Sequence, residues 1–101
     1  MELIDTWADK LNLADWYRWV APQSGTFSVE IDYQIVDGTD LHLRLFRLDA
    51  AGILHQLGSS RNSNTSVQKV SVAVTAGESL FAWVYGFDHS TGTYQMTEAL
   101  A

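Results

Sequence analysis

The feature that most constrains the fold of this chain is a two-residue alternation of apolar and polar side chains, repeated in short runs. It is cleanest where Phe27, Val29, Ile31, Tyr33 and Ile35 alternate with polar residues. Because successive side chains of a β-strand point to opposite faces, this run predicts a strand with one buried and one solvated face. Almost none of the chain has the 3.6-residue period of an amphipathic helix.

Further runs of this kind are separated by turn signals such as Asp37-Gly38-Thr39-Asp40 and Ala76-Gly77-Glu78. The polar stretch Gly58–Ser66 is predicted to be a surface loop. Seven to eight short strands at hairpin spacing predict an all-β fold, an antiparallel β-sandwich of jelly-roll-like type. We expect its strands near Asp15–Val20, Phe27–Ile35, Leu41–Phe46, Ile53–Leu57, Val70–Val74, Leu80–Tyr85 and Tyr94–Met96.

The first segment is different from the rest. Its apolar residues, among them Leu3, Trp7 and Leu11, have a spacing partly consistent with one or two helical turns. One alternative is a linker that packs onto the sandwich or a neighbouring module; the other is an edge strand or irregular lead-in whose Trp7 covers the core. We therefore predict a lead-in or linker at residues 1–14 and one sandwich domain at 15–101, a length that suits a single domain.

Composition excludes several functions. The net charge of -6, with scattered Lys and Arg, argues against nucleic acid and against an anionic membrane surface. The absence of cysteine excludes disulfides, thiolate zinc sites and cysteine nucleophiles. No apolar run approaches 20 residues and no signal peptide is evident, so we expect no membrane span. If the domain is exported, it is then part of a larger protein.

We expect no catalytic residues and no enzymatic activity. The histidines His42, His55 and His89 are isolated from one another in the sequence. No motif of a metalloprotease or serine hydrolase is present.

A calcium site is a weaker expectation. Asp15, Asp37 and Asp40, with Asp9 nearby in sequence, could supply the hard oxygen ligands that calcium requires. Asp37 and Asp40 bracket a glycine-containing turn. The alternative is that these turn aspartates bond their own backbone, as aspartates in turns commonly do. No other cofactor is expected.

The strand Leu80–Tyr85 carries the sharpest candidate for ligand binding. If the small and aliphatic residues of this strand face the core, then Phe81, Trp83 and Tyr85 form an aromatic row on the other face. Exposed together, such side chains mark an interaction surface that could stack on sugar rings or grip a polypeptide. The competing interpretation is structural, with the aromatics in the core or the row covered by the N-terminal segment.

Several segments carry a family resemblance in their order and spacing. They are Asp15-Trp16-Tyr17-Arg18-Trp19, Ala21-Pro22-Gln23-Ser24-Gly25-Thr26-Phe27, Thr39-Asp40-Leu41-His42-Leu43, Thr75-Ala76-Gly77-Glu78, and Val84-Tyr85-Gly86-Phe87 leading to Gly92-Thr93-Tyr94. From Asp15 to Thr97 the chain resembles the bacterial pre-peptidase C-terminal domain, a β-sandwich appended to secreted proteases and related in fold to collagenase collagen-binding domains. The family often has Asp-Leu-Asp-Leu where this chain has Asp40-Leu41-His42-Leu43. One acidic side chain on the outward face is therefore lost, which weakens the inference that this chain binds calcium as some members of the family do.

The resemblance implies a non-catalytic accessory module of a larger secreted or cell-surface bacterial protein. Its expected partner is an extracellular polymer or a neighbouring domain of the parent protein, and we expect a monomer. Two alternatives stay open. One is a structural spacer or secretion and folding aid without a ligand, and the other is a carbohydrate-binding module.

Overall fold

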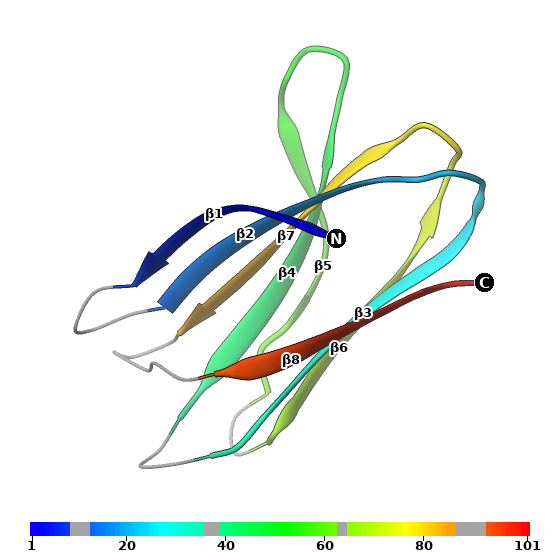
Figure 1. The fold of residues 1–101 in the computed structure, drawn as a ribbon. Coiled ribbons are helices and arrows are strands. Elements are labelled where there is room, and N and C mark those ends of the chain that lie inside the picture. Colours follow the sequence, from blue (N-terminus) through cyan, green and yellow to red (C-terminus); the bar gives the residue numbers. More distant parts are fainter. Residues whose placement is uncertain (9–12, 36–38, 63–64, 87–92) are drawn as a thin grey trace.

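The chain folds into two antiparallel β-sheets that pack face to face (Figure 1). The computed structural model describes residues 1–8, 13–35, 39–62, 65–86 and 93–101, and for residues 5–8 and 13 it describes the backbone alone. These residues form no helix, and so none that is long and apolar enough to cross a membrane. The strands are β1 (Glu2–Ala8), β2 (Leu13–Val20), β3 (Gly25–Tyr33), β4 (Leu41–Leu48), β5 (Leu54–Ser60), β6 (Val67–Val74), β7 (Ser79–Gly86) and β8 (Tyr94–Leu100). The predicted all-β sandwich is confirmed.

The larger sheet has the strand order β1-β2-β7-β4-β5, and the smaller has the order β6-β3-β8. We call them the five-stranded sheet and the three-stranded sheet. The hairpins β1–β2 and β4–β5 stay within the five-stranded sheet, whereas the chain changes sheet at every other connection. Apart from β1, the order β2-β7-β4-β5 over β6-β3-β8 is that of a jelly roll.

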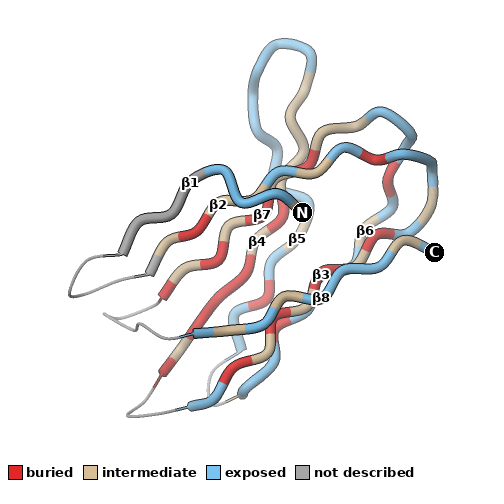
Figure 2. The backbone as a smooth tube through the Cα atoms, in the orientation of Figure 1, coloured by how far each residue is buried: buried red, intermediate tan, exposed pale blue. Residues whose placement is uncertain are grey.

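The core lies between the two sheets and is built by alternate residues of the central strands (Figure 2). In β3 and β7, every second side chain is buried and the residues between them are only partly buried. Antiparallel strands whose residues alternate in this way bury one face against the partner sheet. The buried hydrophobic side chains are Ala21, Phe27, Val29, Ile31, Tyr33, Leu41, Leu43, Leu45, Val70, Val74, Leu80, Ala82 and Val84.

One long side of the sandwich is tightly closed. There β5 approaches β6 so nearly that a Cβ atom on Gly58 would lie 2.8 Å from Val70 Cγ1. The fully buried Gln68 joins the elements at this side: its Nε2 donates to the Tyr33 hydroxyl at 3.1 Å and to the Asn62 carbonyl at 2.7 Å. A buried amide whose polar atoms are all engaged strengthens a core without the cost of an unsatisfied group.

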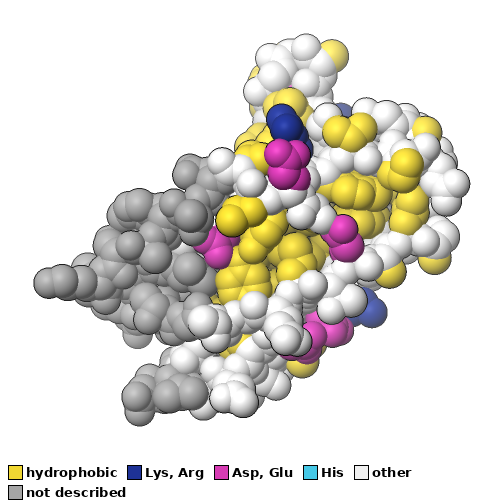
Figure 3. Space-filling model, viewed as in Figure 1, with side chains coloured by type: hydrophobic (Ala, Val, Ile, Leu, Met, Phe, Trp, Pro, Cys, Tyr) yellow, Lys and Arg dark blue, Asp and Glu magenta, His cyan; other side chains and the backbone are white. Residues whose placement is uncertain are grey.

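The opposite side, between β2 and β8, is more open. Tyr17 and Trp19 of β2 and Tyr94 and Met96 of β8 pack against the core but are only partly buried. Figure 3 views the molecule from this side and shows hydrophobic side chains gathered between the edges of the two sheets. The Trp19 ring is stacked on Phe27, with centroids 3.8 Å apart.

Residues 2–8 form an edge strand paired with β2, which is one of the two alternatives for the first segment, whereas the division of the chain after residue 14 stays a prediction. The structure corrects two details of the sequence prediction. The segment Gly58–Ser60 is part of β5 and not of a loop, and its glycine lies where a Cβ atom would meet Val70 of β6. Ile35 lies beyond the end of β3 and is 44 % exposed. The prediction that Trp7 covers the core concerns a side chain outside the described set.

Candidate binding face

The aromatic row of β7 lies on the outer face of the five-stranded sheet. Leu80, Ala82 and Val84 are fully buried in the core, so the residues between them point away from it. Those residues are Phe81, Trp83 and Tyr85, and each is partly exposed. The aromatic row therefore points away from the core, as the alternation indicated, while its ligand-binding role stays a prediction.

Strands β2 and β4 flank β7 and bring further side chains to this face. In the register of the sheet, Trp16 lies opposite Trp83, and Arg44 lies opposite Trp83 from the other side. Directly opposite residues on adjacent strands interact most strongly, so these neighbours belong to the same surface. We call the aromatic members of this surface the outer aromatic cluster: Trp16, Phe46, Phe81, Trp83 and Tyr85.

The rings of the cluster are packed on one another. Trp16 and Trp83 are stacked with centroids 5.4 Å apart, and Trp83 and Tyr85 with centroids 4.0 Å apart. Trp16 also contacts Phe46 across β7, at 5.6 Å and a tilt of 37°. Much of the Trp83 ring is thus already in contact, and its buried Nε1 has no acceptor among the described residues. Stacking therefore holds these rings in position on the outer face.

Arg44 is held within this surface by planar neighbours. Its Nε donates to the Tyr85 hydroxyl at 2.9 Å, and its Nη1 lies 3.5 Å from Gln56 Oε1. Its Cζ is 5.4 Å from the centre of the Tyr85 ring and 5.9 Å from that of Trp83. A guanidinium at these distances is attracted by the negative ring face, so the side chain is fixed in position.

His42 adjoins the cluster at the end where β4 begins. It is on the outer side of the sheet, opposite Tyr85, as the alternation of β4 predicts. It is nevertheless only 5 % exposed: its ring meets the edge of Tyr85 at 5.3 Å, and its Nε2 lies 3.1 Å from Asp40 Oδ1. An outward position in the register is therefore not a solvated one here.

The aspartates predicted as calcium ligands are not assembled among the described residues. Asp15 lies on the inner side of β2, is 8 % exposed and accepts a hydrogen bond from the Tyr94 hydroxyl at 2.5 Å. Asp40 contacts His42, whereas Asp37 and Asp9 lie outside the described residues. The described part of the chain contains no group of three or more acidic, histidine or cysteine side chains that could hold a metal ion. The calcium site stays a prediction.

The environment of Asp15 is a chain of three hydrogen-bonded groups at the open side of the sandwich. The hydroxyls of Tyr17 and Tyr94 are 2.6 Å apart, and Tyr94 donates onward to Asp15. Burial raises the pKa of Tyr94 far above its ordinary value, and the hydrogen bonds to Asp15 and Tyr17 raise it further. Burial likewise raises the pKa of Tyr17. Both phenols therefore stay protonated at neutral pH, and their hydrogen bonds join β2 to β8 at this side.

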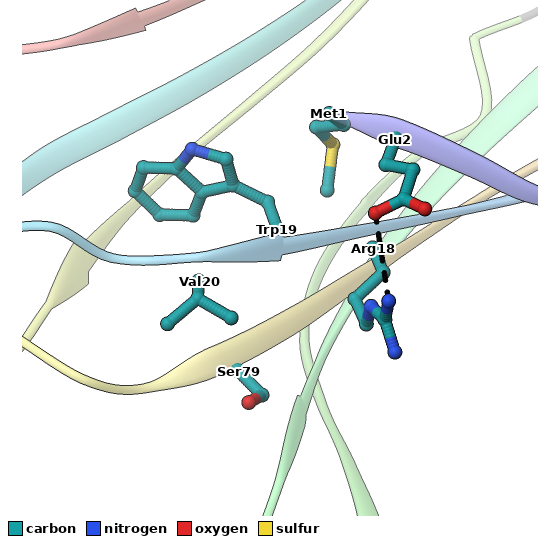
Figure 4. A pocket seen from close by; sticks show the side chains of 6 residues that line it. All are labelled: Met1, Glu2, Arg18, Trp19, Val20 and Ser79. Atoms are coloured by element: carbon teal, nitrogen blue, oxygen red, sulfur yellow. Dashed lines mark hydrogen bonds and ion pairs between the residues drawn. The ribbon is translucent and has the colours of Figure 1, made fainter.

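A shallow pocket of about 550 Å³ lies at the end of the sheet near the amino terminus (Figure 4). Its lining is mixed: Trp19 and Val20 are apolar, whereas Arg18 and Glu2 form an ion pair at 3.5 Å. Both members of this pair are half or more exposed, and exposed ion pairs stabilise little. The pocket is open and has no convergent set of polar groups, so the outer aromatic cluster is the stronger candidate site.

Sequence reasoning missed three members of the face, namely Trp16, Phe46 and Arg44. The signal was present for Phe46 and Arg44, because they alternate with the buried leucines of β4. The sequence did not indicate that β2, β7 and β4 are adjacent in one sheet, because these strands are far apart in the sequence.

Comparison with known proteins supports the fold. No model of a protein family matches the chain, and no curated protein matches it in a sequence search. Among solved structures, the chain is similar to the native structure of a family 35 carbohydrate binding module from Clostridium thermocellum. The TM-score is 0.57 at 10 % sequence identity, over 88 % of this chain and 70 % of that one. At this identity the similarity shows a shared β-sandwich fold.

Proposed function

We propose that this domain is a non-catalytic binding module of a larger secreted or cell-surface bacterial protein, and that its ligand is an extracellular polysaccharide. The observation that carries the proposal is the outer aromatic cluster. The five-stranded sheet already buries its inner face in the core, yet its outer face has five aromatic side chains on three adjacent strands. Contiguous apolar surface of this kind on a soluble domain marks an interaction site.

The composition of the face suits a sugar polymer. The C–H groups of a sugar ring carry slight positive charge and pack against the negative faces of aromatic rings. Polar side chains beside the rings, among them Arg44, Gln56 and Ser59, can bond sugar hydroxyls. The sheet is also long and open, so a chain molecule can lie across several strands.

The fold neighbour supports the same class of ligand. That structure is of a carbohydrate binding module, and this chain shares its sandwich architecture. The resemblance to the pre-peptidase C-terminal domain also implies an accessory, non-catalytic role, and membership of that family stays a prediction. On either basis, the domain would hold an attached protein near its substrate by raising the effective concentration.

Two tryptophans of β2 provide the test, since Trp16 points outward and Trp19 points inward onto Phe27. Binding of the 101-residue chain to a panel of plant, bacterial and fungal polysaccharides would be measured by affinity electrophoresis and calorimetry. We expect Trp16→Ala to weaken binding at least about tenfold while the protein stays folded.

The matched control Trp19→Phe should leave the affinity unchanged, because that ring faces the core side. If the chain binds no polysaccharide of the panel, or if Trp16→Ala binds as well as the parent chain, the proposal fails. The domain would then be a spacer or a folding aid, and the aromatic cluster would serve only to stiffen the sheet.

A further inference from the structure

We propose that the outer aromatic cluster selects an acidic polysaccharide, whose anionic groups are recognised by Arg44. This inference rests on the proposed function, since it names the class of polysaccharide bound at the same face. It is carried by the position, the partners and the charge of one side chain.

Arg44 differs from the neighbouring arginines in its partners. Arg18 of β2 pairs with Glu2 at 3.5 Å, and Arg47 of β4 lies 3.7 Å from Glu78. Within the described residues, Arg44 has no carboxylate partner, and its contacts are with Tyr85, Trp83 and the neutral amide of Gln56. This cation on an apolar face is therefore available to pair with an anion from outside.

The geometry of Arg44 favours an anion that presents two oxygens side by side. A guanidinium has five N–H donors arranged as a fork that pairs with carboxylate or sulfate oxygens two at a time. The bond from Nε to Tyr85 and the longer contact from Nη1 to Gln56 use two of them. The remaining donors are available to a ligand, and a side chain already held in place loses little entropy on binding.

The negative net charge of the domain does not prevent an anion from binding at Arg44. Glu30 and Asp32 belong to β3, in the other sheet, and point away from the core on the far side of the sandwich. Packed sheets are about 10 Å apart, and at physiological ionic strength charges are largely screened beyond about 8 Å. On the five-stranded sheet, Asp40 is the acidic group at the His42 end of the cluster, where its Oδ1 lies 3.1 Å from His42 Nε2.

The test compares polymers that differ in charge. The chain would be titrated with polygalacturonate, with dextran sulfate, with the neutral polymers dextran and glucomannan, and with poly-glutamate. We expect at least about tenfold tighter binding to an acidic polysaccharide than to the neutral ones, as charge-assisted hydrogen bonds usually provide. The carboxylated and the sulfated polymer distinguish the two sources of negative charge.

Variants connect this preference to Arg44. Arg44→Gln should lower affinity for the acidic polymers much more than for the neutral ones, so that the preference is lost, and Arg44→Lys should retain part of the preference through charge alone. The matched control Arg47→Gln, on the same strand but paired with Glu78, should keep the preference. If Arg44→Gln does not fold, the comparison of Arg44→Lys with the parent chain carries the test, because the loss of the fork must reduce the preference.

The outcomes separate this inference from the proposed function. Binding to neutral polymers with no acidic preference overturns the role of Arg44 and leaves the polysaccharide module intact. An acidic preference that survives in Arg44→Gln also overturns it. If the chain binds poly-glutamate as tightly as the acidic polysaccharides, the face recognises negative charge without recognising sugar, and the inference is overturned. If the chain binds none of the polymers, both the inference and the proposed function are overturned.

Discussion

The outer faces of the two sheets differ in a way that their inner faces do not. Outside the three-stranded sheet, the central strand β3 presents Ser28, Glu30 and Asp32, and β6 presents Lys69 and Ser71. Outside the five-stranded sheet, the central strand β7 presents three aromatic side chains, with further aromatics from β2 and β4. The inner faces of β3 and β7 are equally apolar and equally buried.

Folding alone explains the outer face of the three-stranded sheet, but not that of the five-stranded one. A sheet that packs on one side needs only polar residues on the other, and the polar side chains on β3 and β6 meet that need. Aromatic side chains on a solvated face lower solubility unless something covers them. The packing of the two sheets therefore does not explain the outer face of the five-stranded sheet, and this is consistent with the proposed binding function.

The largest effect is expected from Trp83, at the centre of the cluster. Replacing Trp83 by Ala removes the stacking with Trp16 and Tyr85 and should lower the free energy of unfolding by about 2–3 kcal/mol, less than for a fully buried tryptophan. Urea denaturation would measure it. Trp83→Phe keeps a ring and removes an indole nitrogen that has no acceptor among the described residues, so its cost should stay near 1 kcal/mol. A Trp83→Ala protein as stable as the parent chain would show that the cluster contributes nothing to the sheet.

A smaller loss of stability is expected when the hydrogen bond between Tyr85 and Arg44 is removed. Tyr85→Phe removes the hydroxyl that accepts from Arg44 Nε and should cost about 1 kcal/mol of stability. It should also loosen Arg44 and reduce the preference for acidic polymers by a few-fold. Gln56→Ala is the control, since its contact with Arg44 is 3.5 Å long and should matter little. Equal effects of the two substitutions would mean that the tyrosine hydroxyl does not position Arg44.

The period-two pattern predicted the direction of side chains well because it follows from backbone geometry alone. The buried residues of β3, the leucines of β4 and the core residues of β7 all lie on the side that alternation indicates. It failed at Gly58–Ser60, where a glycine and two serines suggested a loop. In the structure these residues continue β5, and Gly58 lies where Val70 of β6 leaves no room for a Cβ atom.

The candidate site was only partly predictable for a different reason. The row of Phe81, Trp83 and Tyr85 is contained in one strand, so alternation was enough to find it. Its enlargement by Trp16 and Arg44 depends on which strands are neighbours, and this is set by packing between residues distant in sequence. No local pattern contains the stacking of the rings, which follows from the register of β2 and β7.

On the polar outer face, substitutions should have little effect. The hydroxyls of Ser28 and Ser71 are 2.8 Å apart across β3 and β6, and both are accessible to water. Because water replaces a lost partner there, Ser28→Ala should cost about 0.5 kcal/mol or less. The double variant Ser28→Ala/Ser71→Ala should cost no more than the sum of the single ones, as measured by a double-mutant cycle. A cost approaching that of Trp83→Ala would erase the contrast between the faces.

The smallest effect concerns charge on the same polar face, where Glu30 and Asp32 lie close together on β3. The hydrogen bond with Asp32 raises the pKa of Glu30, the negative charge of Asp32 raises it further, and Lys69 acts in the opposite direction. A carboxyl whose pKa is raised by folding stabilises the protein below its ordinary pKa, and this stabilisation is lost as the pH rises through the raised value. Glu30→Gln removes the repulsion and should raise the melting temperature slightly at pH 7. The gain should vanish at about pH 4, near the ordinary pKa of a glutamate. Asp32→Asn should act in the same direction, and a lower melting temperature of Glu30→Gln at pH 7 would show that the attraction to Lys69 outweighs the repulsion from Asp32.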